Sequence, residues 1–226
     1  MNNLPSYISI TFILTTLLAV WIFYKSTKNF WQSLIILLAW LTLQMVVSLT
    51  GFNTVTNNFP PRFILLPMPM MLFIIILFVT KMGRQFIDRL DIKTLTILHI
   101  IRIPVEVVLY WLFINKTIPQ LMTFEGRNFD ILSGITAPLV YYFGFIKPVI
   151  HRKIILLWNI FCLGLLINIV IIAIFSAPFT FQQLAYDQPN IAILYFPFTW
   201  LPCCVVPIVL FAHLAVIRGL TIKRDR

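Results

Sequence analysis

Charged residues are scarce in this chain, and acidic ones are the scarcest. Charged side chains make up 11% of the 226 residues, with 7 Asp and Glu against 17 Lys and Arg, while 60% of the residues are hydrophobic. The mean hydropathy is +0.95. A water-soluble domain needs a largely polar and charged surface, so this composition excludes one of appreciable size. We expect a single all-α domain, residues 1–226, embedded in a membrane.

Motifs for metal binding are also absent from the sequence. None of the three His and three Cys follows an HxxxH, HExxH or CxxC spacing. His99 and His213 are expected in the same half of the membrane, where they can face each other, but Arg102 one turn from His99 would repel a cation. We therefore predict neither a metal site nor a cofactor. Cysteines in apolar stretches behave as small hydrophobic residues, and this role is expected for Cys162, Cys203 and Cys204.

Seven apolar stretches account for most of the chain. A helix needs roughly 17–25 apolar residues to cross a hydrocarbon core about 30 Å thick, and most of the stretches have this length. We predict a polytopic integral membrane protein with seven transmembrane helices. The first stretch is expected to remain as a helix, because no small-residue cleavage site follows it. The predicted spans are residues 7–24, 33–50, 63–80, 94–114, 129–146, 154–175 and 191–217.

Basic residues divide unevenly between the two sides of this arrangement. Thirteen of the 17 Lys and Arg fall on one side, Arg62, Lys116 and Arg127 fall on the other, and Arg102 lies within a span. Because basic loops stay in the cytoplasm, the cell-membrane topology predicted has the amino terminus outside and the carboxyl terminus in the cytoplasm. Topology and contact with anionic lipids then explain the net charge of +10, and nucleic acid is not expected as a partner.

The first three and the last three spans share features in the same order. Ile22–Lys25 ends the first span as Gly144–Lys147 ends the fifth, and Pro67 in the third has a counterpart in Pro197 in the seventh. This order suggests a parallel three-plus-one-plus-three pseudo-repeat with the fourth span as linker. The alternative is a chance similarity between two halves rich in Leu, Ile and Phe.

The predicted plan can be compared with two families. With its outside amino terminus it resembles the SWEET and PQ-loop transporters, although the dipeptide Pro119-Gln120 lies in an outer loop and not inside the first and fifth spans. Microbial rhodopsins share the number and orientation of helices. The seventh span contains no Lys for a retinal Schiff base, which excludes retinal photochemistry.

The fourth span carries His99, Arg102 and Glu106, followed one turn later by Tyr110. Spacings of three and four residues place these four side chains on one helical face. Glu106 lies about 18 Å inside the span at about 1.5 Å per residue, where an ionisable group marks a functional site by default. Arg102 is its expected partner, and Pro104 should loosen the helix between them. The pair is interpreted as a structural contact, as the centre of a substrate, ion or proton site, or as part of a lipid-filled groove.

A second polar cluster precedes the fifth span and contains Glu125, Arg127 and Asp130. Two interpretations stay open. The cluster can be a solvated loop in which Asp130 or Asn128 caps the following helix, or it can be the outer vestibule of a pocket that ends at Glu106.

Aromatic and proline residues supply candidate walls for such a pocket. Trp111 and Trp200 can face it, or they can be the interfacial anchors that Trp commonly forms near a membrane surface. Pro197, Pro202 and Pro207 are expected to kink the seventh span and leave a cavity beside it.

Residues Ile103–Tyr110, with the sequence IPVEVVLY, carry a further resemblance. They are similar to the Pro-x-Glu-Glu segment of membrane-embedded heterodimer-type lycopene cyclases, in which carboxylates protonate a polyene. Val107 stands in place of the second acid, and the likeness is confined to these residues. The resemblance implies that Glu106 acts as a general acid in an apolar pocket.

The leading hypothesis is a membrane protein that binds and transports a small or amphipathic molecule at a polar site inside the bilayer. Its expected partners are the lipid bilayer and a small or lipophilic ligand. One alternative is a sensor or accessory subunit that partners another membrane protein or a second copy of the chain. Another is a membrane-embedded enzyme acting on an isoprenoid or other lipid. The candidate ligand-binding residues are Glu106, Arg102, Tyr110, His99, Glu125, Arg127, Asp130, Trp111 and Trp200.

Overall fold

The computed structural model describes residues 4–56 and 61–222, and these residues form helices and turns without a strand. Long apolar runs satisfy their own backbone hydrogen bonds as helices, and the all-α prediction is confirmed for the described chain. The α-helices are α1 (Ser6–Ser26), α2 (Trp31–Leu49), α3 (Met68–Val79), α4 (Lys81–Arg89), α5 (Ile92–Leu98), α6 (Arg102–Ile114), α7 (Ile131–Tyr141), α8 (Arg152–Phe175) and α9 (Val206–Thr221). Short 3-10 turns are η1 (Phe52–Thr54), η2 (Arg62–Leu65), η3 (His99–Ile101), η4 (Gln120–Met122) and η6 (Ala192–Leu194), and π-helical turns are η5 (Tyr142–Ile146) and η7 (Leu201–Val205).

Six helical segments of the described chain are long and apolar enough to cross a membrane. The fifth predicted span, residues 129–146, contains a shorter apolar helix, Ile131–Ile146. The structure thus supports a membrane-type helical bundle, and the count of seven spans stays a prediction. The six segments are Ser6–Ser26, Trp31–Leu49, Arg62–Val79, Ile92–Ile114, Arg152–Phe175 and Leu201–Thr221.

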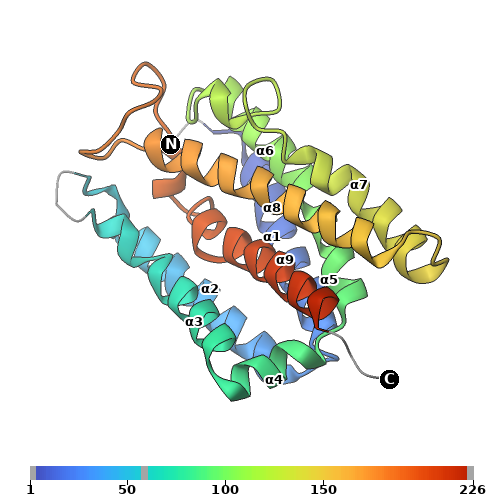
Figure 1. Ribbon diagram of the computed structural model, residues 1–226. Coiled ribbons are helices and arrows are strands. Elements are labelled where there is room, and N and C mark those ends of the chain that lie inside the picture. The colour runs from blue at the N-terminus through green and yellow to red at the C-terminus, as the bar shows by residue number, and fades with distance from the viewer. Residues whose placement is uncertain (1–3, 57–60, 223–226) are drawn as a thin grey trace.

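Helix α9 lies between two groups of helices, with α2, α3 and α4 along one side and α6, α7 and α8 along the other (Figure 1). In the segment Leu201–Thr221, which ends in α9, 61% of the apolar window is buried, compared with 22% in α2 and 17% in the segment Arg62–Val79 that contains α3. Buried alanines, Ala212 and Ala215, give α9 a slim surface, and α5 and α8 pack against it. The helices with the least cover from the rest of the protein are therefore α2 and α3.

Prolines interrupt two of the long segments. In the fourth, the turn η3 separates α5 from α6 shortly before Pro104, which has no N–H to donate to the preceding turn. The interruption predicted between Arg102 and Glu106 thus lies one turn earlier, at His99–Ile101, and α6 is regular from Arg102 to Ile114. In the seventh predicted span, the expected start at Ile191 is wrong, because the long helical segment begins at Leu201. Pro197 lies before this segment, and Pro202 lies within its first turn, the π-helical turn η7.

Helix α4 is a short amphipathic helix that the pattern of apolar spans does not predict. Its first turn is capped by Thr80, whose hydroxyl accepts a hydrogen bond from the N–H of Gly83 at 3.1 Å. Ile87 is buried, while Asp88 forms an ion pair with Arg218 of α9 at 2.9 Å. This pair ties α4 across one end of the bundle (Figure 1). The exposed basic residues of the helix are Lys81, Arg84 and Arg89.

Candidate functional site

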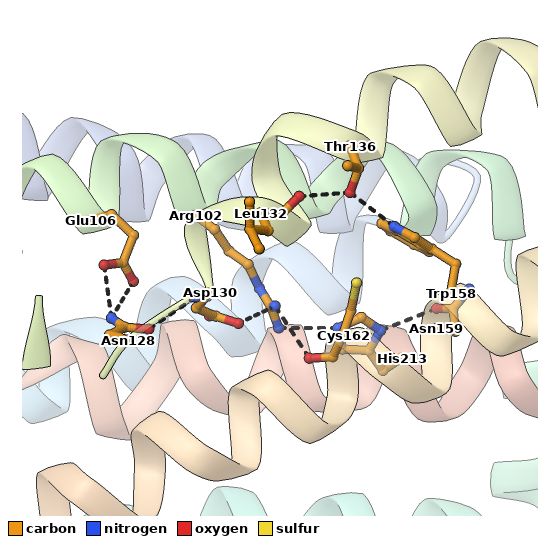
Figure 2. A network of polar contacts seen from close by, with 10 residues as sticks. All are labelled: Arg102, Glu106, Asn128, Asp130, Leu132, Thr136, Trp158, Asn159, Cys162 and His213. Atoms are coloured by element: carbon orange, nitrogen blue, oxygen red, sulfur yellow. Dashed lines mark hydrogen bonds and ion pairs between the residues drawn. The ribbon is translucent and has the colours of Figure 1, made fainter. Parts of the chain in front are cut away.

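A buried ion pair joins α6 to the start of α7. Arg102 and Asp130 are 3% and 5% exposed, and Nη1 of Arg102 donates to Oδ1 of Asp130. The cost of removing two charges from water is offset only when they pair closely, as they do here. The predicted pairing of Arg102 with Glu106 is therefore wrong. Within the described residues the guanidinium turns towards α7 and contacts Asp130 instead (Figure 2).

The other arm of the guanidinium contacts His213 of α9. Nη2 of Arg102 lies 3.0 Å from Nε2 of His213, and Nδ1 of His213 lies 3.1 Å from Oδ1 of Asn159 on α8. A guanidinium only donates hydrogen bonds, so Nε2 accepts and Nδ1 carries the proton that Asn159 accepts. His213 is thus held as one neutral tautomer. The hydrogen-bonded chain crosses α6, α9 and α8 (Figure 2).

Glu106 is bound by an amide and not by a cation. Both of its carboxylate oxygens accept from Nδ2 of Asn128, at 2.6 and 2.7 Å, and the same nitrogen lies 3.0 Å from the carbonyl oxygen of Met122. Oδ1 of Asn128 accepts from the backbone N–H of Asp130 at 3.0 Å. Glu106 is thus linked to Arg102 through this loop, but its carboxylate forms no ion pair with any of the described residues.

The segment 115–130 folds inward from the end of α6 and so brings these groups to the helices. Its backbone is held in a turn by the hydrogen bond from the N–H of Asn128 to the carbonyl of Thr123 at 3.3 Å. Asn168 of α8 donates to the carbonyl of Arg127 at 2.9 Å. Irregular backbone is tolerated among apolar helices where neighbouring groups satisfy it. Helix α7 consequently begins beside α6, inside the bundle, which explains its short length.

An apolar cavity of ≈ 510 Å³ lies beside Glu106 and Asp130. Its wall is formed by η2 and α3 on one side and by α8 on the other, with η7, α9 and α6 behind. Apart from the two carboxylates, the residues that line it are apolar. Its volume falls in the range of roughly 300–1,000 Å³ that is common for small-molecule sites. Residues from each part of this wall are Phe63, Met71, Leu109, Leu166, Leu201 and Leu210.

Three other predicted residues, Tyr110, Glu125 and Arg127, lie away from the cavity. Tyr110 stacks on Phe124 with 5.0 Å between ring centroids. Glu125 and Arg127 are exposed on the loop. The described lining of the cavity includes none of the three. The predicted outer cluster is therefore divided: Asp130 enters the bundle, while Glu125 and Arg127 stay at the surface.

The two predicted tryptophans also lie away from the cavity. Trp111 meets Tyr7 of α1 edge to face, with 4.9 Å between ring centroids. Nε1 of Trp200 donates to the carbonyl of Leu41 at 3.0 Å. Neither is among the described residues that line the cavity, so the prediction that they form its walls is wrong. Both side chains join neighbouring helices instead.

His99 packs behind the network and does not line the cavity. Its ring lies on the ring of His213 with 3.8 Å between centroids and 16° between planes, which confirms that the two histidines face each other. His99 is fully buried, and both of its ring nitrogens lack a hydrogen-bond partner among the described residues. Those residues also contain no group of three His, Cys, Asp or Glu that could hold a metal ion. The contact of His99 with the network is therefore the stacking of its ring on the ring of His213.

Sequence reasoning missed the part that two asparagines play. Asn159 is a polar residue within the apolar run Leu157–Phe161, and a buried amide must find a hydrogen-bond partner. The position of this amide in an apolar run was sufficient to identify Asn159 as a candidate for a buried hydrogen bond. Asn128 was considered only as a helix cap, because a polar residue between an arginine and a helix start looks like an ordinary loop residue.

The fold and the network define a class of protein, an all-helical membrane-type bundle with buried charged groups beside a partly open apolar cavity. Residues 59–221 match a protein family described as "Domain of unknown function (DUF8737)", and because the match spans more than half of the chain, the protein belongs to this family. The matched region contains the whole network, from His99 to His213. No curated protein and no solved structure matches the chain.

Proposed function

We propose that this protein binds a small amphipathic molecule in the cavity beside Glu106 and transports it. The observation that carries the proposal is the carboxylate of Glu106, held at the wall of a largely apolar cavity and bound there, among the described residues, by the amide of Asn128 and by no cation. An ionised carboxylate in apolar surroundings is costly without a charged partner. A ligand with a cationic or hydrogen-bond-donating end offsets this cost, while its apolar body fills the cavity.

The neighbouring groups favour Glu106 as the contact over Asp130. Asp130 already neutralises Arg102 in a buried ion pair, so a cationic ligand would have to compete with a guanidinium there. The Asn128 amide holds both oxygens of Glu106 and adds no positive charge. This arrangement orients the carboxylate of Glu106 and leaves its negative charge unpaired, so that a cationic ligand can form an ion pair with it.

The test compares dodecylamine with dodecanol and dodecanoate as probes of the purified protein in neutral detergent. We expect dodecylamine to raise the melting temperature most, because a ligand that binds only the folded state stabilises it. Glu106→Gln keeps the side-chain shape but cannot ionise. Since a hydrogen bond to a charged group contributes about 1.5–3 kcal/mol, the variant should bind dodecylamine at least about tenfold more weakly.

Glu125→Gln is the matched control, because Glu125 is exposed and is not part of the cavity lining. It should bind dodecylamine as the wild type does. A Glu106→Gln protein that folds normally and retains the preference for the amine would exclude Glu106 as the binding group. Transport is measured separately, as uptake of dodecylamine into proteoliposomes. Uptake should be lower in Glu106→Gln than in the wild type, because the variant binds the amine more weakly.

We also propose a seven-span topology with the amino terminus outside, in which α7 together with the inward loop forms the fifth span. The unequal distribution of basic residues supports this orientation. Single cysteines at Asn57, which lies outside the described residues, and at Asp187 should react with an impermeant thiol reagent added to intact cells of a variant without native cysteines. Protection of both positions until the cells are opened would reverse the orientation. The three-plus-one-plus-three repeat stays a prediction.

A second candidate is an enzyme acting on an isoprenoid or other lipid. It is favoured by the position of Glu106, the carboxylate of the cavity that is not paired with Arg102, against a lining that is otherwise hydrocarbon apart from Asp130. A general acid in such a site can protonate a double bond and later recover a proton, which leaves the mass of the substrate unchanged. Incubation of the protein with lycopene would then yield an isomer of equal mass and altered retention time, and Glu106→Gln would yield none.

A further inference from the structure

A second cavity, of ≈ 570 Å³, lies on the other side of the bundle between α2, α3, α4 and α9. It shares no lining residue with the cavity beside Glu106. Two polar groups reach its wall, and both are already bonded: the hydroxyl of Ser33 lies 3.1 Å from that of Thr27, and the indole N–H of Trp40 donates to the carbonyl of Cys203 at 2.8 Å. The cavity therefore suits hydrocarbon and offers no group to a polar ligand.

One end of this cavity reaches the basic end of the bundle. Phe30, before α2, and Phe86, on α4, both line it and their ring centroids lie 6.5 Å apart. Lys28 stands two residues before Phe30, and Arg89 stands three residues after Phe86 on the same face of α4, and both are exposed. The chain thus places one cation on each of the two segments that border this end of the cavity.

The acidic residues of this end have other roles among the described residues. Asp88 pairs with Arg218. Asp91 accepts hydrogen bonds from the backbone N–H groups of Lys93 and Thr94 and so caps α5. Positive charge therefore dominates beside an apolar cavity, which complements a molecule with an anionic head and a hydrocarbon chain.

The exposed faces of α2 and α3 favour a lipid over another protein helix as the occupant. Helices that associate within a membrane present Gly, Ala or Ser, so that their backbones can approach closely. These two helices present large aliphatic side chains, each at least half exposed. Examples are Ile35, Ile36, Leu43, Leu72, Ile75 and Ile76.

We propose that this cavity binds one acyl chain of an anionic phospholipid whose phosphate is held by Lys28 and Arg89. The chain lies between α2 and α3 and covers the least buried helices of the bundle. The phosphate lies at the end marked by Phe30 and Phe86. Juxtamembrane basic residues attract anionic lipids, and the apolar cavity beside them holds the lipid in place.

The test measures thermal stabilisation of the purified full-length protein by dioleoyl phosphatidylglycerol and by dioleoyl phosphatidylcholine, which carry the same chains. Phosphatidylglycerol should bind more tightly to the wild type. The double variant Lys28→Gln/Arg89→Gln should lose this preference and bind phosphatidylglycerol at least about tenfold more weakly. The double variant Lys116→Gln/Arg127→Gln, which removes two exposed cations elsewhere, should behave as the wild type.

Ala39→Phe provides an independent readout, because Ala39 is an exposed residue that lines the cavity. A larger side chain fills the space for the acyl chain and should weaken both lipids, whatever their head group. Equal stabilisation by the two lipids in the wild type would overturn the proposal, as would an unchanged preference in the Lys28→Gln/Arg89→Gln variant. A wild-type dimer that Ala39→Phe converts to a monomer would identify a second copy of the chain as the occupant and would equally overturn it.

Discussion

Replacing Arg102 by methionine is expected to cost about 3–5 kcal/mol of folding free energy. The substitution strands the carboxylate of Asp130 in the interior and removes the donor to Nε2 of His213. Methionine fills a similar volume, so the loss comes from the unpaired charge and not from a void. The measurements are the yield of monodisperse protein in detergent and its melting temperature, and both should fall sharply.

A double-mutant cycle tests whether the stability lost in Arg102→Met comes from the contact between Arg102 and Asp130. Arg102→Met combined with Asp130→Asn should be much less destabilised than the sum of the two single variants, because neither charge is left alone. The matched cycle with Glu106→Gln should show a much smaller coupling, since Glu106 contacts Asn128 and reaches Arg102 only indirectly through the loop. Strong coupling to Glu106 together with additivity towards Asp130 would contradict the structure and restore the pairing expected from spacing on one helix.

Gly126→Ala is expected to have the second large effect. A Cβ atom at this position would lie 2.2 Å from the carbonyl oxygen of Gln120 and 2.8 Å from Cα of Leu121. Both atoms belong to the backbone, so the loop has to open, and overpacking of this kind costs about 1–3 kcal/mol. Asn128 follows two residues later and should lose its contact with Glu106. The variant should therefore melt at lower temperature and bind dodecylamine less well.

Gly164→Ala is the control for this substitution. Gly164 lies on α8, and an added Cβ meets no atom of the described residues within 4 Å. Alanine is also a better helix former than glycine by up to about 1 kcal/mol, so the melting temperature should be unchanged or slightly raised. Equal losses in the two variants would show that the close approach at Gly126 does not govern the loop.

The helical bundle could be predicted from the sequence because membrane helices depend on length and apolarity. The predicted limits 7–24 and 154–175 compare well with Ser6–Ser26 and Arg152–Phe175. Helix α4 was missed, since its cations were counted only as loop charges. The start of the seventh span was misplaced because apolar composition alone does not reveal where Pro197 and Pro202 prevent a regular helix.

The candidate site was predictable as a set of residues but not as a set of contacts. Periodicity correctly placed Arg102 and Glu106 on the same helix, and their ionisable character marked them. It could not show that Asp130 would displace Glu106 as the partner of Arg102, because that contact depends on a loop folding inward. Nor could it separate Glu125 from Asp130, five residues apart, although one stays in contact with solvent and the other becomes buried.

The short length of α7 has a consequence for the seven-span topology proposed above. The helix Ile131–Ile146 is about 24 Å long at about 1.5 Å per residue, which is short of a core about 30 Å thick. The rest of its path is irregular backbone, acceptable there only once Arg102 has paired with Asp130 and Asn168 has bonded to the loop. Asn168 belongs to α8, which is synthesised after α7. In the proposed seven-span topology we therefore expect stable integration of α7 to wait for α8.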